Sequence, residues 1–73
     1  MTELEMETRL KEKYSEADVA VIDMTGGGNH FEARISASSF SKLSRVERHQ
    51  AVMSVFDEEI KSGEVHALSV KFL

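Results

Sequence analysis

Two segments with apolar side chains at every second position flank one segment with helical periodicity, and this order constrains the fold more than any other feature. Residues 30–36 alternate between apolar and polar side chains, and residues 65–73 alternate in the same way. Residues 44–62, between them, have apolar side chains at helical spacing. Two strands joined by a helix pair in parallel through a right-handed crossover, and alternation is typical of a sheet with one covered face. The sequence therefore predicts a strand-helix-strand unit with one open sheet face.

The N-terminal part of the chain adds one helix and one strand. Thr2 and Glu5 form a capping box, and apolar residues follow at four-residue spacing up to Tyr14, which predicts a helix ending there. Residues 17–24 are apolar and rich in β-branched side chains, as is typical of a strand. The glycine triplet Gly26-Gly27-Gly28 then predicts a hairpin that makes the first two strands antiparallel.

The fold class that these elements predict is α+β, in a single domain covering residues 1–73. The predicted order is α-β-β-α-β, with both helices on one face of a three-stranded mixed sheet. The second helix begins with a capping box at Ser44 and Glu47 and stops at Ser62-Gly63, where glycine adopts the left-handed conformation without steric cost. Its apolar stripe consists of Val46, His49, Val52, Met53, Phe56 and Ile60. We expect one long helix with this stripe buried.

The residue types that are missing narrow the chemistry. The chain has no cysteine, which excludes disulfides, thiolate zinc sites and a thiol nucleophile within it. No apolar run approaches the roughly 18 residues of a membrane span. The acidic start resembles neither a signal peptide nor a transit peptide. We therefore expect a soluble cytoplasmic protein without a membrane partner.

The sequence also lacks the patterns of an enzyme. It has no paired carboxylates embedded in apolar sequence and no Gly-x-Ser-x-Gly motif. The glycine triplet is followed by a strand, without the lysine and the helix of a phosphate-binding loop. A domain of 73 residues leaves little room for a substrate pocket. We predict that the protein is not an enzyme.

Charge is distributed unevenly along the chain. The net charge is -4 and the isoelectric point is about 5.3, which weighs against a dedicated nucleic-acid binder. Acidic residues concentrate near the two ends, and the middle carries a basic group that consists of Arg34, Lys42, Arg45 and Arg48. This basic group either meets an acidic partner or forms a solvated helix face.

Three histidines are the remaining candidates for a site. His49 lies on the apolar stripe, where a buried, hydrogen-bonded structural histidine is the default interpretation. His30 begins a strand on its polar face and should be exposed beside the glycine loop. His66 opens the last strand in phase with core residues, and both a packing role and a functional role are open for it. Alternation puts His30 and His66 on opposite faces unless a strand end is irregular. With no His-x-x-x-His motif, we expect no autonomous metal site.

Three short motifs within residues 30–73 resemble those of BolA-like proteins. The motifs are Gly-Asn-His30-Phe31, then Phe40-x7-Arg48-His49-x-x-Val52, then His66-Ala67-Leu68-Ser69. The glycine loop and the Ser-Arg-Val at the start of the second helix are most similar to the IbaG (YrbA) branch of this family. The resemblance implies a fold similar to a class II KH domain, in agreement with the predicted order of elements.

For function, the resemblance implies partnership with a monothiol glutaredoxin. In such complexes a [2Fe–2S] cluster is held by a glutaredoxin cysteine, a glutathione thiol and histidine from the BolA-like protein. The family's histidine ligand corresponds to His66. Related proteins have a second ligand in the loop between the first two strands, and here only His30, at the edge of residues 25–29, is available. Because the imidazole must be neutral, assembly should weaken as the pH falls. The isolated chain should hold no cofactor and be a monomer or weak dimer.

The sequence departs from the family pattern in the turn before the second helix. The resemblance also leaves a second function open. Lys42 stands where the family has a glycine, just before the second helix. BolA-like proteins are also described as transcription regulators, so nucleic-acid binding through Arg34, Lys42, Arg45 and Arg48 is the alternative function. The acidic isoelectric point and the lack of a Gly-x-x-Gly clamp weigh against it.

Overall fold

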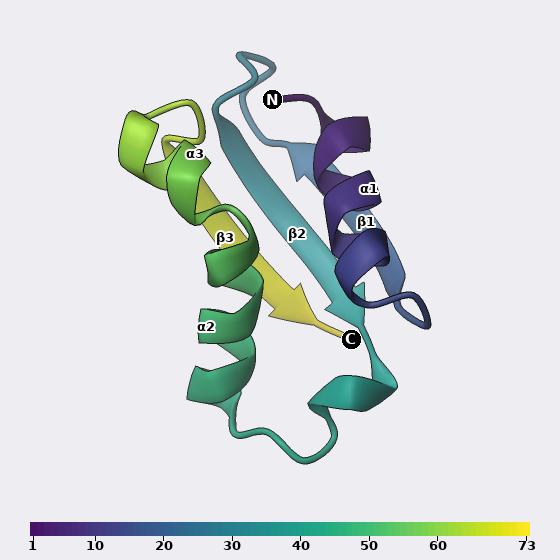
Figure 1. The fold of residues 1–73 in the computed structure, drawn as a ribbon. Coiled ribbons are helices and arrows are strands. Elements are labelled where there is room, and N and C mark those ends of the chain that lie inside the picture. Colours follow the sequence, from purple (N-terminus) through teal and green to yellow (C-terminus); the bar gives the residue numbers. More distant parts are fainter.

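Three strands form one mixed sheet, and the helices lie over one of its faces (Figure 1). The structure is a computed structural model that describes all 73 residues. Its elements are α1 (Glu3–Lys13), β1 (Asp18–Asp23), β2 (His30–Ser36), the 3-10 helix η1 (Ser38–Phe40), α2 (Arg45–Val55), α3 (Asp57–Ser62) and β3 (Ala67–Phe72). None of these helices has the length and apolar character needed to cross a membrane.

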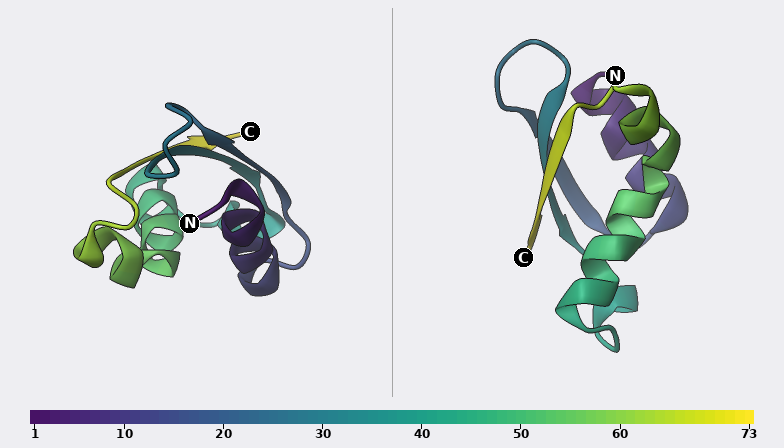
Figure 2. Two further views of the ribbon diagram at one scale, coloured as in Figure 1. Left: turned by 90° about the horizontal axis from the view of Figure 1, so that it is seen from above. Right: turned by 90° about the vertical axis from the view of Figure 1, so that its left-hand side faces the viewer.

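β2 is the central strand of the sheet. It pairs antiparallel with β1 and parallel with β3, so that Ala33 lies opposite Val21 on one side and Val70 on the other. Figure 2 shows α1 and α2 against the same face of the curved sheet, with the other face open. These observations confirm the predicted α+β class, the order of elements, the mixed sheet and its one-sided cover.

The core lies between the sheet and the two longer helices. Side chains from α1, β2 and α2 supply most of it, and the largest that are fully buried are Met6, Leu10, Phe31, Ile35, Val52, Phe56 and Val65. Removing one such side chain from water contributes about 1.5–3 kcal/mol. A small domain has few of these contacts, so each is a large share of its net stability.

The prediction of one long second helix is wrong, because α2 and α3 meet at a break at Phe56. Phe56 has φ -113° and ψ 22°, outside regular helical geometry, and its side chain is fully buried. The three residues that follow, Asp57 to Glu59, are all acidic and stabilise the positive first turn of a new helix. This acidic triplet is the sequence signal for a helix start that the apolar periodicity concealed.

The predicted burial of the apolar stripe is also wrong at the start of α2. Val46 is 66% exposed and His49 is exposed, whereas Val52 is fully buried. The first turns of α2 face only β3, which is the edge strand of the sheet, and a groove separates the two. No further strand is present to cover this part of the helix.

Arg9 of α1 connects α1 to the break between α2 and α3. Its Nη1 and Nη2 donate to Oε1 and Oε2 of Glu59 at 2.6 and 2.9 Å, which makes a bidentate ion pair. Nη1 also lies 3.4 Å from the carbonyl oxygen of Val55, and the guanidinium carbon lies 5.8 Å from the centre of the Phe56 ring. In a continuous helix the Val55 carbonyl would accept the Glu59 N–H, so Arg9 compensates for a bond lost at the break.

We expect Glu59→Gln to lower the melting temperature at neutral pH. Hydrogen bonding to Arg9 holds the pKa of Glu59 below its ordinary value of 4.5. The pair therefore stabilises the fold above that pH, and the stabilisation is lost as the pH falls through the lower pKa of the folded state. Thermal unfolding followed by circular dichroism should show the wild-type advantage shrinking across this acidic range.

Glu58→Gln is the matched control, because Glu58 is an exposed acid of the same helical turn that makes no ion pair within 4 Å. It should change the melting temperature less than Glu59→Gln does. A wild-type advantage over Glu59→Gln that is the same at every pH would contradict the assigned role of the pair.

Gly63 ends α3 and turns the chain back toward the sheet. Its φ is +85°, in the left-handed region, which confirms the predicted helix stop. Past the turn, the N–H of Val65 donates to the carbonyl of Glu59 at 3.0 Å. The turn thus delivers the chain to the sheet immediately before His66.

We expect Gly63→Ala to lower the free energy of unfolding by about 1 kcal/mol. A Cβ at this position would meet no atom within 4 Å, so the cost comes from the backbone conformation alone. Gly63→Asn should cost less, because asparagine tolerates the left-handed region better than alanine. Urea unfolding measures both losses, and a larger loss for asparagine would contradict this explanation.

Candidate functional site

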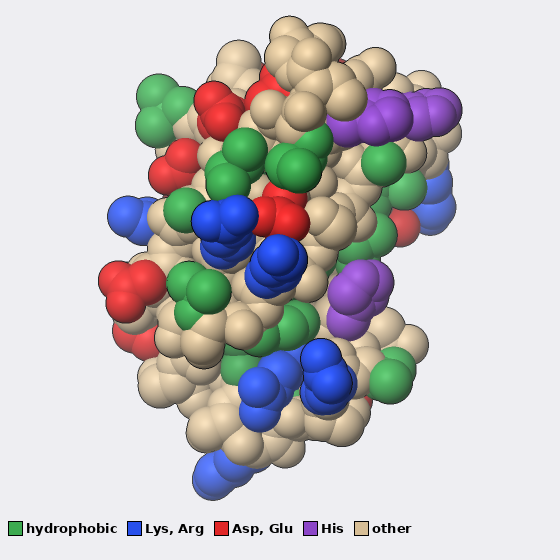
Figure 3. Space-filling model, turned by 180° about the vertical axis from the view of Figure 1, so that it is seen from behind, with side chains coloured by type: hydrophobic (Ala, Val, Ile, Leu, Met, Phe, Trp, Pro, Cys, Tyr) green, Lys and Arg blue, Asp and Glu red, His purple; other side chains and the backbone are tan.

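His30 and His66 stack against each other at one end of the sheet. Their ring centres are 5.2 Å apart and the ring planes differ by 16°. His30 is partly buried and His66 is exposed. Figure 3 shows one elongated histidine patch near the top of the open side and a separate, smaller one below it. The two rings are therefore not separated as strict alternation would have them, and the exception for an irregular strand end applies.

The parallel pairing of β2 and β3 brings the two histidines together. His30 lies opposite Ala67 in the register, so His66 comes level with Asn29, one position before either strand begins. The carbonyl of Asn29 accepts the N–H of His66 at 2.7 Å and that of Ala67 at 3.2 Å. Because His66 precedes β3, its side chain is not bound by the alternation of the strand, and its ring can turn toward His30.

The glycine loop beside His30 is organised around the carboxylate of Asp23. Oδ1 of Asp23 accepts the N–H groups of Thr25 and Gly26 at 3.3 and 2.9 Å, and Oδ2 accepts that of Gly28 at 2.9 Å. Gly26 and Gly28 have φ values of 77° and 74°, which glycine adopts without strain. Sequence reasoning missed Asp23, although aspartate before a glycine-rich turn is a known turn signal.

The two imidazoles do not make a metal site by themselves. No group of three or more histidine, cysteine, aspartate or glutamate side chains is arranged to hold a metal ion. The amides of the glycine loop donate to Asp23 and, at Gly27, to the Thr25 hydroxyl, so the loop serves as a hairpin connection. A metal centre that used His30 and His66 would need further ligands from other molecules.

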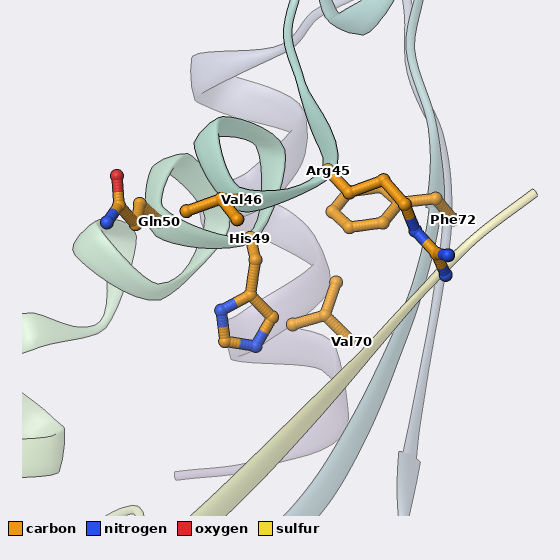
Figure 4. Close-up of a pocket in the computed structure, with 6 residues that line it drawn as sticks. All are labelled: Arg45, Val46, His49, Gln50, Val70 and Phe72. Atoms are coloured by element: carbon orange, nitrogen blue, oxygen red, sulfur yellow. The ribbon is translucent and has the colours of Figure 1, made fainter.

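His49 is not the buried structural residue that its position on the stripe predicts. It lies in the groove between α2 and β3, with Val46 of α2 beside it and Val70 of β3 across from it (Figure 4). No side-chain hydrogen bond to His49 is present within the chain. Its ring is therefore available on the surface, in a groove that neither His30 nor His66 lines.

The four basic residues singled out from the sequence do not form one cluster. Nε of Arg34 donates to Oε2 of Glu32 at 2.8 Å on the open face of the sheet. Nε of Arg48 donates to the carbonyl of Leu43 at 3.0 Å. Lys42 is exposed in the loop before α2, and Arg45 lies in the groove.

Sequence reasoning placed Glu32 near the basic residues but missed Lys71, its neighbour in this region. Glu32 is only 7% exposed, and Oε1 of its carboxylate lies 3.8 Å from Nζ of Lys71. Lys71 also joins Arg45 and Arg48 around one hollow. Alternation within each strand places both side chains on the open face of the sheet. Only the register between β2 and β3 shows that they are neighbours.

The groove between α2 and β3 consists of two adjoining hollows of about 380 and 450 Å³. Both are lined by Arg45, Val70 and Phe72. The first hollow adds Val46, His49 and Gln50, and the second adds Arg48, Lys71 and Leu73. The groove thus has an apolar floor and a cationic rim.

The chain is similar to known proteins over almost its whole length. The family model described as "BolA-like protein" matches residues 2–73. Protein BOLA2 of Arabidopsis thaliana is 36% identical over 72 residues, which cover 97% of this chain and 75% of that protein. BolA-like protein 3 of Homo sapiens is 37% identical over 70 residues, which cover 93% of this chain and 64% of that protein.

Solved structures agree with these matches. The BolA domain of SufE1 from Arabidopsis thaliana superposes with a TM-score of 0.84 at 28% identity, over 96% of this chain and 87% of that domain. A bol-like protein from Babesia bovis gives a TM-score of 0.84 at 27% identity, over 100% and 84% of the two chains. The family match and the level of identity together establish that this chain belongs to the BolA-like protein family.

Proposed function

We propose that this BolA-like protein is a non-enzymatic partner of a monothiol glutaredoxin and shares a [2Fe–2S] cluster with it. The observation that carries the proposal is the stacked pair of His30 and His66 at an accessible end of the sheet. The glutaredoxin, the cluster and a role in cluster trafficking or iron regulation are inferences from the family resemblance and from this pair.

The donor set fits such a cluster if a partner completes it. Imidazole nitrogen is a good iron ligand, and [2Fe–2S] centres with two histidine ligands on one iron are known. A [2Fe–2S] cluster takes four terminal ligands. The glutaredoxin cysteine and glutathione would supply two thiolates, which leaves two positions for His66 and His30. A chain without cysteine can take part only in this way.

The local structure supports His66 as the principal ligand. Its ring is exposed, while its backbone is held by the bond from its N–H to the Asn29 carbonyl. His30 is fixed at the first position of β2 and supports the His66 ring by stacking. A ligand that is pre-positioned by its own fold loses less conformational entropy on binding.

We expect His66→Ala to abolish the spectral change that marks the shared cluster. The experiment adds the protein to a monothiol glutaredoxin carrying its glutathione-ligated [2Fe–2S] cluster and records visible absorption and circular dichroism. His49→Ala is the matched control, because His49 is exposed but lies in the groove beside α2, outside the stacked pair. An unchanged spectrum with the wild-type protein, or full retention of the change in His66→Ala, would overturn the proposal.

We expect His30→Phe to weaken the shared cluster as much as His30→Ala does. Phenylalanine keeps an aromatic ring for stacking on His66 but has no nitrogen to bind iron. Comparable loss in both variants would identify His30 as a ligand. A shared cluster that persists in His30→Phe and not in His30→Ala would instead restrict His30 to positioning His66.

Nucleic-acid binding, the alternative function, has less support from the side-chain arrangement. Arg34 is paired with Glu32, and part of the Arg48 guanidinium is engaged with the Leu43 carbonyl. The aromatic Phe72 packs edge-on against Phe40, with ring centres 5.5 Å apart, and does not present a free stacking platform.

A further inference from the structure

The outer edge of β3 has no partner. The N–H groups of Ala67 and Leu73 donate to carbonyls of Asn29 and Ile35 on the β2 side. In a parallel pair, the N–H and carbonyl groups of every second residue point toward the neighbouring strand. The N–H and carbonyl groups of the alternate residues point away from it. These outward residues are Leu68, Val70 and Phe72. No strand lies on that side, and no hydrogen bond from another element reaches their N–H or carbonyl groups.

The groove runs beside this free edge. The side chains of Val70 and Phe72 point into it and remain partly exposed, and Val46 of α2 is 66% exposed on the opposite wall. Figure 4 shows His49 and Val46 facing Val70 across the groove, with Arg45 beside Phe72. The free backbone edge and the apolar hollow therefore adjoin each other.

The charge around the groove is opposite to that of the chain. Arg45, Arg48 and Lys71 line it, and no Asp or Glu side chain does. The protein as a whole has a net charge of -4. Figure 3 shows several Lys and Arg side chains close together in the middle and lower part of the open side of the molecule. A positive rim favours an acidic ligand, and it disfavours a two-fold contact in which the same rim of a second copy meets it.

We propose that β3 and the groove bind an extended, acidic segment of a partner protein, which adds to the sheet as a fourth strand. Its backbone would bond to the outward groups of Leu68, Val70 and Phe72. Alternate side chains of an added strand point to opposite faces, so apolar ones enter the groove toward α2. The acidic side chains of the added strand lie on its other face, beside Lys71. At the end of β3, where one hollow joins Lys71 and Arg45, they also meet Arg45.

A peptide fits these features better than a nucleic acid does. A strand edge presents N–H donors and carbonyl acceptors at the spacing of another strand, which is the basis of recognition by strand addition. A sugar-phosphate backbone has no N–H donors to match the outward carbonyls. Single-stranded nucleic acid also requires open aromatic faces, and the Phe72 ring is partly buried against Phe40.

The proposed docking edge is separate from the histidine pair. His30 and His66 lie where β2 and β3 begin, whereas Arg45, Lys71 and Phe72 lie where β3 ends. Neither histidine lines the groove. The inference therefore stands independently of the iron–sulfur proposal, and a failure of one leaves the other intact.

The test uses a short synthetic peptide in which glutamate alternates with valine, labelled with a fluorophore. Fluorescence anisotropy should detect binding to the full chain, and the affinity should fall as salt rises. Amide hydrogen exchange followed by NMR should show new protection at Leu68, Val70 and Phe72. The amides of Ser69 and Lys71 face β2 and should change little. The same peptide N-methylated at alternate amides should not bind, because it cannot pair with the edge.

Two variants test the two parts of the surface. Arg45→Glu should weaken peptide binding about fivefold, the effect of an exposed charge, while Lys11→Glu, at an exposed cation on α1, should not. Val70→Pro removes one outward N–H without touching a β2–β3 hydrogen bond, a position that an edge strand tolerates. It should abolish binding with the circular dichroism spectrum unchanged. His66→Ala should bind the peptide as the wild type does.

Four outcomes would overturn the proposal. These are no binding of the glutamate-valine peptide at millimolar concentration, equal binding of the N-methylated peptide, and tighter binding of an oligothymidylate of the same length. The fourth is protection of Leu68, Val70 and Phe72 in the free protein together with a doubled mass in solution. That result would show that a second copy of the chain occupies the edge.

Discussion

The parallel pairing of β2 with β3 is the constraint on which the rest of the structure depends. Parallel strands begin at the same end of a sheet, so the pairing places His30 beside His66 although 35 residues separate them in the sequence. The crossover that makes this pairing possible also places α2 over β3. Since β3 is the last strand, the same pairing leaves its outer edge and the facing side of α2 uncovered.

Only a few helical turns cover the three-stranded sheet. α1 packs over β1 and α2 packs toward β3, and a small core holds both of them. The break at Phe56 lets this large side chain enter the core, and the Arg9–Glu59 pair then holds α1 against the broken helix. Such a pair between two elements matters more in a small domain, where few other contacts join them.

Local sequence patterns were sufficient to predict the order of helices and strands. They were insufficient to predict which side chains these elements bury, expose or bring together. The capping boxes at Thr2 and Ser44 and the turn at Gly63 are local signals, and the structure confirms all three. Arg9 contacts the break at Phe56 from 47 residues away, and periodicity cannot register such a contact. The exposure of His49 depends on β3 being an edge strand. The stacking of His30 on His66 depends on a register that no single strand encodes.

A single partner protein that used both proposed sites would have to contact the histidine pair at the start of β3 and the groove at its end. At about 3.3 Å per residue, His66 and Phe72 are about 20 Å apart, within the reach of one ordinary protein interface. A protein that placed thiolates at the histidine pair and an acidic segment along the edge would bind both ends at once. The second contact would then be intramolecular, and its effective concentration would raise the affinity without any new contact. The iron–sulfur ligands would set the chemistry of such a complex, and the strand edge would select its partner.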